Sequence, residues 1–467
     1  MRRIALGLAF LASSAGAAAA SSLDVSTEYR LRALSYENLN LNTDLSNDHS
    51  FISQSARLGF AIKDIHLTDA RGENETLNIV LKLRAIGVEG STSTLAAAPF
   101  DRIAENYPDA SFKPFLENAY FEARRLGGKP WDLVVGRQSF RLGTGLLLDD
   151  NGAGLNGVTA KGELPFWDMR ANTFFLQTQA RQIGAPRNVS FFGLTLELPS
   201  EGVWQLNQLV EKDRTPETLM VTGCTAAGGT LTGYSAGCEV SQATRWFSSL
   251  RYQLHYGPLV FDGEAALQKG AATPTGLDAA QNHITFNGNA EVLRLKWKQT
   301  FWRKKDTGKA VEGIARAVFA RGSGDNPATP TTDESFFPSN GLRYDGMERT
   351  GFGEFFAATP YDAFGGQSTA TASGLQRGAS GILAAGFGIT PPAWKGIVLD
   401  VDYFLYQADR NIGYHRTLGS ELDVALRYDI QGRFTMRATA AFFKTGPASN
   451  VNKNAARRMM FEASAKF

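Results

Sequence analysis

The strongest constraint on this chain is a period-two alternation of apolar and polar residues that recurs from residue 23 to its end. Clear examples are the runs 23–33, 77–85, 397–403 and 421–428. Successive side chains of a strand point to opposite faces, so each run predicts a β-strand with one apolar and one polar face. Runs of about ten residues also match the length that a tilted strand needs to cross a bilayer. Mean hydropathy is −0.20, which is typical of membrane barrels because their alternation averages out the apolar signal.

The alternation divides residues 21–467 into about 18 strands, an even number of the kind that closes bacterial outer-membrane barrels. Short turns rich in Gly and Pro alternate along the chain with long polar loops, which is the layout of such barrels. We therefore predict an all-β fold, a transmembrane antiparallel up-and-down β-barrel with long extracellular loops and short periplasmic turns. The expected strands cover 23–34, 51–65, 76–88, 114–125, 131–142, 153–162, 166–177, 188–198, 202–211, 244–256, 258–269, 289–301, 309–321, 380–391, 396–407, 417–428, 433–444 and 456–467.

The two ends of the chain carry export signals. Residues 1–20 combine Arg2 and Arg3 with a short apolar run and a small-residue tract, which predicts a signal peptide cleaved after Ala20. The last strand alternates and ends on Phe467, similar to the terminal signal of bacterial outer-membrane proteins. These features predict the outer membrane of a Gram-negative bacterium, with membrane lipid as a partner. Without the two leading arginines, 46 basic residues (48 less 2) balance 46 acidic ones, which argues against a nucleic-acid partner.

The sequence offers little support for an enzyme. Its five histidines are scattered, and no HExxH, GxSxG or phosphate-binding loop motif is present. We expect neither a catalytic residue nor a cofactor. A calcium ion at 149–152 and a carboxylate pair acting on lipid or polysaccharide remain alternatives. Cys224 and Cys238 share one long predicted outer loop without a nearby histidine, which favours a disulfide over a metal site.

The stretch 134–150 draws attention to the lumen. If 131–142 is one strand, Arg137, Ser139 and Arg141 share a face. With apolar faces toward lipid, further arginines of neighbouring strands would face inward and line a pore that favours anions. Candidate pore-lining cations are Arg84, Arg124, Arg137, Arg141, Arg170, Arg427 and Arg437, interleaved with acidic residues. A cross-strand network of salt bridges that supports the wall is the structural alternative.

Two segments resemble a known family. Gly136-Arg137-Gln138 with its following glycine turn and Asp149-Asp150 resembles the alginate export family of outer-membrane porins, and so does Leu418–Asp429 with the pattern LGxExD. The resemblance implies a monomeric barrel with an arginine-rich constriction, in a family whose members export anionic exopolysaccharide or serve as less well defined porins. Periplasmic export or assembly partners are a further expectation. The matching residues are Arg137, Glu421, Asp423 and Arg427.

The predicted function is therefore an outer-membrane channel for passive passage of an anionic saccharide or polysaccharide. A general or small-carboxylate porin and an outer-membrane enzyme are the alternatives. The longest predicted loop, 322–379, is aromatic enough to fold inward as a lid or constriction, with Arg343 and Arg349 as candidate contacts; an aromatic patch in the outer leaflet is the other interpretation.

Overall fold

The computed structural model describes the chain outside a set of gaps. The gaps are 1–20, 39–47, 68–74, 91–110, 151, 153, 166–167, 179–188, 215–224, 227–228, 231–238, 276–283, 304–309, 327, 330–331, 341–350, 359–362, 365–380, 411–414 and 449–453. The signal peptide, the pair Cys224 and Cys238, and Arg343 and Arg349 lie outside the described residues, so those expectations stay predictions.

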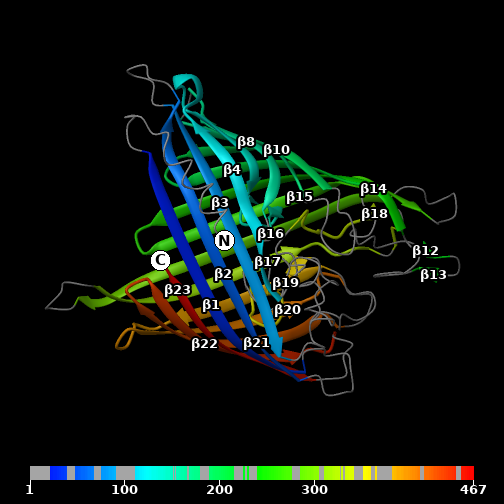
Figure 1. Ribbon diagram of the computed structural model, residues 1–467. Helices are drawn as coiled ribbons and strands as arrows, with labels where there is room; N and C mark the ends of the chain where they lie inside the picture. The colour runs from blue at the N-terminus through cyan, green and yellow to red at the C-terminus, as the bar shows by residue number, and fades with distance from the viewer. Residues whose placement is uncertain are drawn as a thin grey trace.

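The wall of the molecule is a closed antiparallel barrel of 18 strands, and the all-β expectation is confirmed (Figure 1). The wall strands are β1 (Ser22–Glu37), β2 (His49–His66), β3 (Thr76–Gly90), β4 (Ser111–Arg124), β5 (Trp131–Gln138), β8 (Leu155–Glu163), β9 (Arg170–Gln177), β10 (Val189–Pro199), β11 (Val203–Asp213), β14 (Glu239–Tyr256), β15 (Leu259–Thr275), β16 (Ile284–Arg303), β17 (Ala310–Gly322), β19 (Ile382–Thr390), β20 (Ile397–Gln407), β21 (Thr417–Ile430), β22 (Phe434–Thr445) and β23 (Ala455–Lys466).

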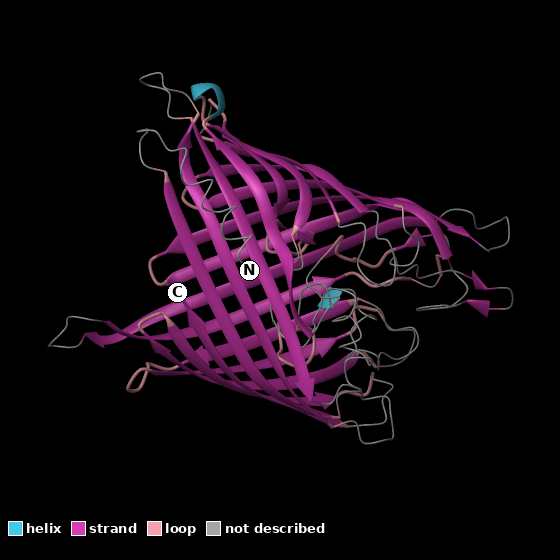
Figure 2. Ribbon diagram, viewed as in Figure 1, coloured by secondary structure: helices cyan, strands magenta, loops and turns pink. Residues whose placement is uncertain are grey.

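Each wall strand pairs with the next along the chain, and β1 pairs with β23 to close the ring. At the closure Arg30 lies opposite Ser464, and the backbone of Phe467 exchanges two hydrogen bonds with Thr27. Closure leaves no free sheet edge, which is why a barrel can span hydrocarbon without unpaired backbone groups. Figure 2 shows how completely strands make up the wall.

The outer face is apolar because alternate side chains of each strand point away from the lumen. Leu23, Val25, Tyr29 and Leu31 of β1 are exposed on this face, and Met459 and Phe461 of β23 continue it across the closure. In a soluble protein such a surface would be buried, so its exposure marks the lipid-facing side. Among the described residues, no helix is long and apolar enough to cross a membrane.

Short elements lie off the wall. β6 (Arg141–Leu142) pairs with β7 (Leu148–Asp149), β12 (Thr225–Ala226) pairs with β13 (Gly229–Thr230), and β18 (Thr332–Asp333) runs parallel to β16. A 3₁₀ turn, η2 (Leu126–Gly128), joins β4 and β5. The predicted strand 131–142 is therefore wrong after Gln138, where the chain leaves the wall.

Candidate functional site

Two chain segments enter the barrel and meet inside it. The inward hairpin is 139–154, which contains β6 and β7. The long inner segment is the described part of 323–364. The amide of Ser339 donates to the carbonyl of Leu147 at 2.9 Å, and the amide of Asp149 donates to the carbonyl of Asn340 at 2.9 Å. Leu147 and its neighbour Leu148 are fully buried at this junction. The lumen is therefore occupied by protein backbone from two loops that are bonded to each other.

The inward hairpin corrects the expected polar row. Arg141 does not continue the face of Arg137 along one wall strand, because it belongs to β6 inside the barrel. Its Nε lies 3.2 Å from Oδ2 of Asp149 on β7, and about half of its side chain is exposed. Gly143 and Gly145 supply the positive φ angles, 63° and 85°, that the turn between β6 and β7 requires.

The tip of the hairpin is fastened to a distant part of the wall. Glu264 of β15 accepts hydrogen bonds from the Thr144 amide and the Thr144 hydroxyl, both at 2.7 Å, and from Ser249 Oγ at 2.7 Å. A Cβ at Gly143 would lie 2.2 Å from the Glu264 carboxylate, so only glycine fits there. Since β5 and β15 are separated by β8, β9, β10, β11 and β14, the hairpin crosses the lumen.

The base of the hairpin is held by Asp150. Its carboxylate accepts from the Phe140 amide at 3.2 Å and from the Gly152 amide at 3.0 Å. Burial raises the pKa of Asp150 to about 6, and the neighbouring charge of Asp149 adds to this effect. Arg137 is only 9% exposed and packs against the backbone of Gly154, with Asp150 as a charged neighbour. Arg137 therefore supports the hairpin and does not present its charge to the open lumen.

Residues 332–340 of the long inner segment are held by a buried ion pair on the wall. Arg245 of β14 pairs with both oxygens of Glu211 at 2.8 and 2.9 Å, and both side chains are about 2% exposed. The same guanidinium donates to the carbonyl of Phe337 at 2.9 Å, and Ser339 Oγ donates to Glu211. The bidentate geometry suits a planar guanidinium, which has further donors left for the carbonyls of the segment.

Residues 351–358 are held by a second cluster, on β21, β22 and β23. Glu421, fully buried, accepts from the amides of Phe355 at 2.6 Å and Phe356 at 2.9 Å. Asp423 accepts from the amide of Glu354 at 2.9 Å. The Glu354 carboxylate in turn pairs with Arg437 at 2.7 Å and with Arg458. Two of the residues that carry the family resemblance, Glu421 and Asp423, thus act on the backbone of the long inner segment.

The remaining sequence candidates fall in three environments. Arg84 is buried and lies 3.7 Å from Glu117, with its Nη1 3.5 Å from the carbonyl of Gly152. Arg124 lies at the end of β4, half exposed, and pairs with Glu122 at 3.0 Å. Arg427 is exposed on the inner face of β21, opposite Arg437 in the register of β22. Arg427 thus presents its charge to the lumen, whereas Arg84 does not.

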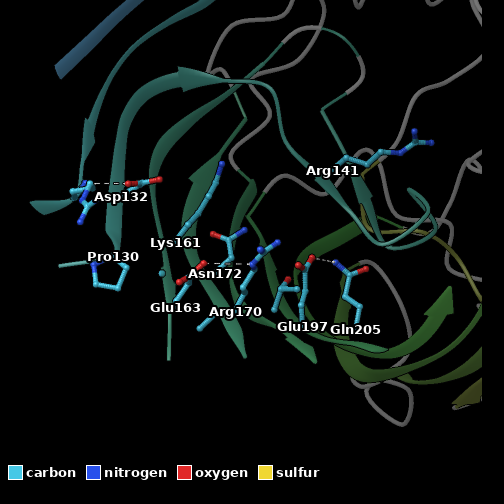
Figure 3. A pocket seen from close by; sticks show the side chains of 13 residues that line it. Pro130, Asp132, Arg141, Lys161, Glu163, Arg170, Asn172, Glu197 and Gln205 are labelled. Atoms are coloured by element: carbon cyan, nitrogen blue, oxygen red, sulfur yellow. Dashed lines mark hydrogen bonds and ion pairs between the residues drawn. The ribbon is translucent and has the colours of Figure 1, made fainter. Parts of the chain in front are cut away.

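Exposed cations gather in a polar cavity of about 720 Å³ on the inner wall of β8–β11, below the hairpin. Figure 3 shows Lys161, Arg170 and Asn172 near one another on neighbouring strands, whereas Arg141 lines the cavity from the hairpin, apart from them. Arg170 is 66% exposed, and its Nε lies 3.9 Å from the equally exposed Glu163. Glu197 is engaged by Gln205 at 3.1 Å. The cavity also contains three carboxylates, Asp132, Glu163 and Glu197, and its positive side chains and amide donors are a set that can bind the carboxylate of a solute.

Four residues of these two clusters escaped the sequence-based candidates: Glu211, Arg245, Glu354 and Arg458. Arg245 shares the parity of Arg251, which faces inward, so alternation alone could have placed its side chain in the lumen. Its partners in 337–339 lie 92 to 94 residues away, and no local pattern predicts them. In the part of the chain that the structure describes, no group of three or more His, Cys, Asp or Glu side chains is arranged to hold a metal ion.

Comparison with known proteins bears on the fold. No protein-family model and no curated protein matches the sequence. Among solved structures, the chain is similar to OpdK of Pseudomonas aeruginosa with vanillate (TM-score 0.51, 12% identity, covering 95% of this chain and 98% of that one). It is also similar to OccK9 (OpdG) of the same organism (0.54, 11%, 95% and 99%) and to OccAB3 of Acinetobacter baumannii (0.53, 11%, 95% and 99%).

The chain has the fold of outer-membrane porins of the Occ/Opd kind. At 11–12% identity the likeness supports the barrel fold alone, and any transported solute has to be inferred from the residues of this chain.

Proposed function

We propose that the protein is a passive outer-membrane channel, acting as a monomer, for small anionic solutes that carry a carboxylate. The observation that carries this proposal is that the acidic and the basic residues of the lumen have different roles. Near the inner segments, the acidic residues Glu211, Glu264, Glu354, Glu421 and Asp423 are all buried and accept hydrogen bonds that hold backbone in place.

The cations differ from these acids because several remain exposed to the water of the lumen. On the inner face these are Lys82, Arg141, Lys161, Arg170, Lys296, Lys298 and Arg427. Exposed acids such as Asp24 and Glu163 also occur there, at the periplasmic ends of their strands, where Glu163 lies opposite Arg170. A water-filled path with surplus positive charge concentrates anions and lowers their barrier to entry.

The solute size follows from the two inner segments. Because the inward hairpin crosses the lumen and bonds to the long inner segment, the open path is narrower than the barrel itself. A narrowed path suits a small carboxylate better than a polymer. The similarity to a porin whose structure contains vanillate, an aromatic carboxylate, supports the same solute class.

The finer proposal of alginate-type polysaccharide export rests on the resemblance of 136–138 and 418–429. In this chain, Glu421, Asp423 and Arg137 are engaged in fastening the inner segments. Of the residues that match the family, Arg427 alone among the described ones is exposed to the lumen. Saccharide export is therefore the second candidate.

Planar-bilayer recordings test the proposal. We expect an anion-biased reversal potential in a salt gradient for the wild-type channel. The triple variant Arg141→Ala, Lys161→Ala, Arg170→Ala should lower the anion-to-cation permeability ratio several-fold, since each charge contributes about 1 kcal/mol in a water-like medium. Lys444→Ala is the matched control, because Lys444 shares the outward parity of Phe442 on β22.

Two outcomes contradict the proposal. A cation-selective wild-type channel, or a triple variant as anion-selective as the wild type, would remove the role of the lumen cations. Benzoate and a uronate oligomer added to one chamber then separate the two solute classes. We expect brief current interruptions with benzoate at millimolar concentration and none with the oligomer; the reverse result favours saccharide export.

A further inference from the structure

The outer wall carries a feature that transport through the lumen does not use. On β14, Trp246 faces outward and is 56% exposed. Tyr256, ten residues nearer the periplasmic turn Gly257–Pro258, is 73% exposed on the same face. Ten strand residues span about 33 Å, or about 25 Å across the membrane once strands tilt by about 40°. The two aromatic residues therefore mark the two edges of the apolar band, with Trp246 at the extracellular edge.

Two lysines flank Trp246 at this edge. Lys269 of β15 is its direct cross-strand neighbour. Lys212 of β11 lies opposite Thr244, one outward position above Trp246. Both side chains are exposed and share the outward parity of Leu206 on β11 and Leu267 on β15. The two lysines are two strands apart across the sheet and two residues apart along it, which places their Cα atoms about 12 Å from each other. Their four-carbon side chains can therefore reach one group between them.

The charges of these lysines are not neutralised by acids in the described part of the chain. Lys269 donates to the side-chain oxygen of Asn287, and the Lys212 ammonium lies 5.6 Å from the ring centre of Phe192. Two arginines on the same outward rim differ. Arg321 pairs with Asp409 at 2.8 Å, and Arg457 pairs with Glu37 at 3.3 Å. The lysine pair therefore leaves an uncompensated positive patch beside a membrane-interface tryptophan.

We infer that Lys212 and Lys269 bind the phosphate of an outer-leaflet glycolipid. The height fits a headgroup, since interfacial tryptophans lie at the headgroup level. The charge fits a phosphate, for which a lysine ammonium is a suitable point-charge partner. The surface below fits acyl chains, because Leu206, Leu250 and Leu267 continue downward from Trp246 on the same outer face. Asn287 and Trp246 add polar donors next to the lysines.

Native mass spectrometry of the full-length barrel in detergent tests this site. The probe is lipid A with two phosphate groups, compared with the same lipid after removal of its phosphates. Near a negatively charged membrane surface each lysine contributes about 1 kcal/mol, which is about fivefold in affinity. We expect Lys212→Ala with Lys269→Ala to weaken binding of the phosphorylated lipid about 25-fold, while Lys212→Arg with Lys269→Arg retains most of it. Lys444→Ala, a single outward lysine on β22, should leave binding unchanged.

Three results would overturn the inference. They are equal binding by the double alanine variant, equal binding of the dephosphorylated lipid, and displacement of the lipid by millimolar inorganic phosphate, which would indicate a site for the free ion. Folding is checked by single-channel conductance, which we expect to be unchanged because neither lysine faces the lumen. A channel without anion selectivity would contradict the proposed transport function and leave the lipid site standing.

Discussion

The two segments inside the barrel are built differently. The inward hairpin is short, and its tip depends on one wall carboxylate, Glu264, which accepts three hydrogen bonds. The long inner segment is held at two separate places, by the Arg245–Glu211 pair and by the cluster of Glu421, Asp423 and Glu354 with its arginines. We therefore expect the long inner segment to be held firmly and the inward hairpin to be released more easily.

The type of anchor also differs. Arg245 and Glu211 form a fully desolvated ion pair, and the remaining donors of Arg245 bind backbone carbonyls. Loss of either partner therefore leaves a buried charge without its counter-charge. Glu264 accepts hydrogen bonds from neutral groups and lies near Arg251 and Arg294, for which Asp262 is the stronger acidic neighbour. Removing Glu264 costs hydrogen bonds but leaves Asp262 as the acidic neighbour of Arg251 and Arg294. Mutating each anchor should therefore destabilise the two inner segments by different amounts.

The largest effect is expected for Arg245→Ala. Loss of one partner of a buried pair costs about 3–5 kcal/mol, because the charge of Glu211 stays buried without compensation. Residues 332–340 should detach, and single-channel conductance should rise and become noisy. Guanidinium unfolding from lipid vesicles gives the stability change, and bilayer recordings give the conductance.

Arg251→Ala is the control for the effect of Arg245. Arg251 lies on the same strand and inner face and pairs with both oxygens of Asp262 at 2.8 Å. It differs from Arg245 because it is partly exposed and, among the described residues, donates no hydrogen bond to an inner segment. We expect a much smaller loss of stability and quiet currents. Quiet currents from Arg245→Ala as well would show that its pair with Glu211 does not hold the segment.

How far the sequence predicts this arrangement depends on the range of the forces involved. The wall was predictable because lipid on one side and water on the other impose alternation residue by residue, as in 397–403 of β20 and 421–428 of β21. The prediction failed at Ser139, where the chain turns inward. That turn depends on Gly143 and on Glu264, which is 120 residues beyond Thr144. Alternation carries no information about such a contact.

The same reasoning explains the site residues. Glu421 and Asp423 were selected for their inward parity and for the family resemblance, and their side chains do point inward. Their role as acceptors for the backbone of 354–356 was not visible, since it requires knowing which distant segment enters the lumen. A polar inward row therefore predicts where a side chain points, and does not distinguish a pore-lining charge from an anchor.

Glu264→Ala should give an intermediate effect, confined to the inward hairpin. Three hydrogen bonds to a carboxylate are lost, and we expect a destabilisation of about 3 kcal/mol. Hydrogen exchange should show loss of protection at 142–146, with the long inner segment unchanged. Glu264→Gln, which keeps the shape of the side chain and one acceptor oxygen, should recover part of the protection. Equal loss of protection in both segments would show that they move as one unit, contrary to the comparison.

The smallest effect is a pH dependence at the base of the hairpin. Since burial raises the pKa of Asp150 to about 6, above its ordinary value of 3.8, the folded hairpin binds this proton more tightly than the unfolded chain does. Its contribution to stability is therefore full at low pH and is lost as the pH rises through about 6. Between pH 5 and pH 7 the loss is about 1 kcal/mol, from a shift of about two pKa units.

Hydrogen exchange at the Phe140 and Gly152 amides, corrected for the intrinsic rate at each pH, measures this change. Protection should fall by roughly tenfold from pH 5 to pH 7 in the wild type. In Asp150→Asn, which keeps an acceptor without a titrating proton, the protection should no longer vary with pH. The Arg245 anchor serves as the internal control, because residues 337–339 bind a guanidinium that stays charged between pH 5 and pH 7. A pH response of equal size at 337–339 would mean that Asp150 acts through the junction at Leu147 and Ser339, and that the two segments share one release step.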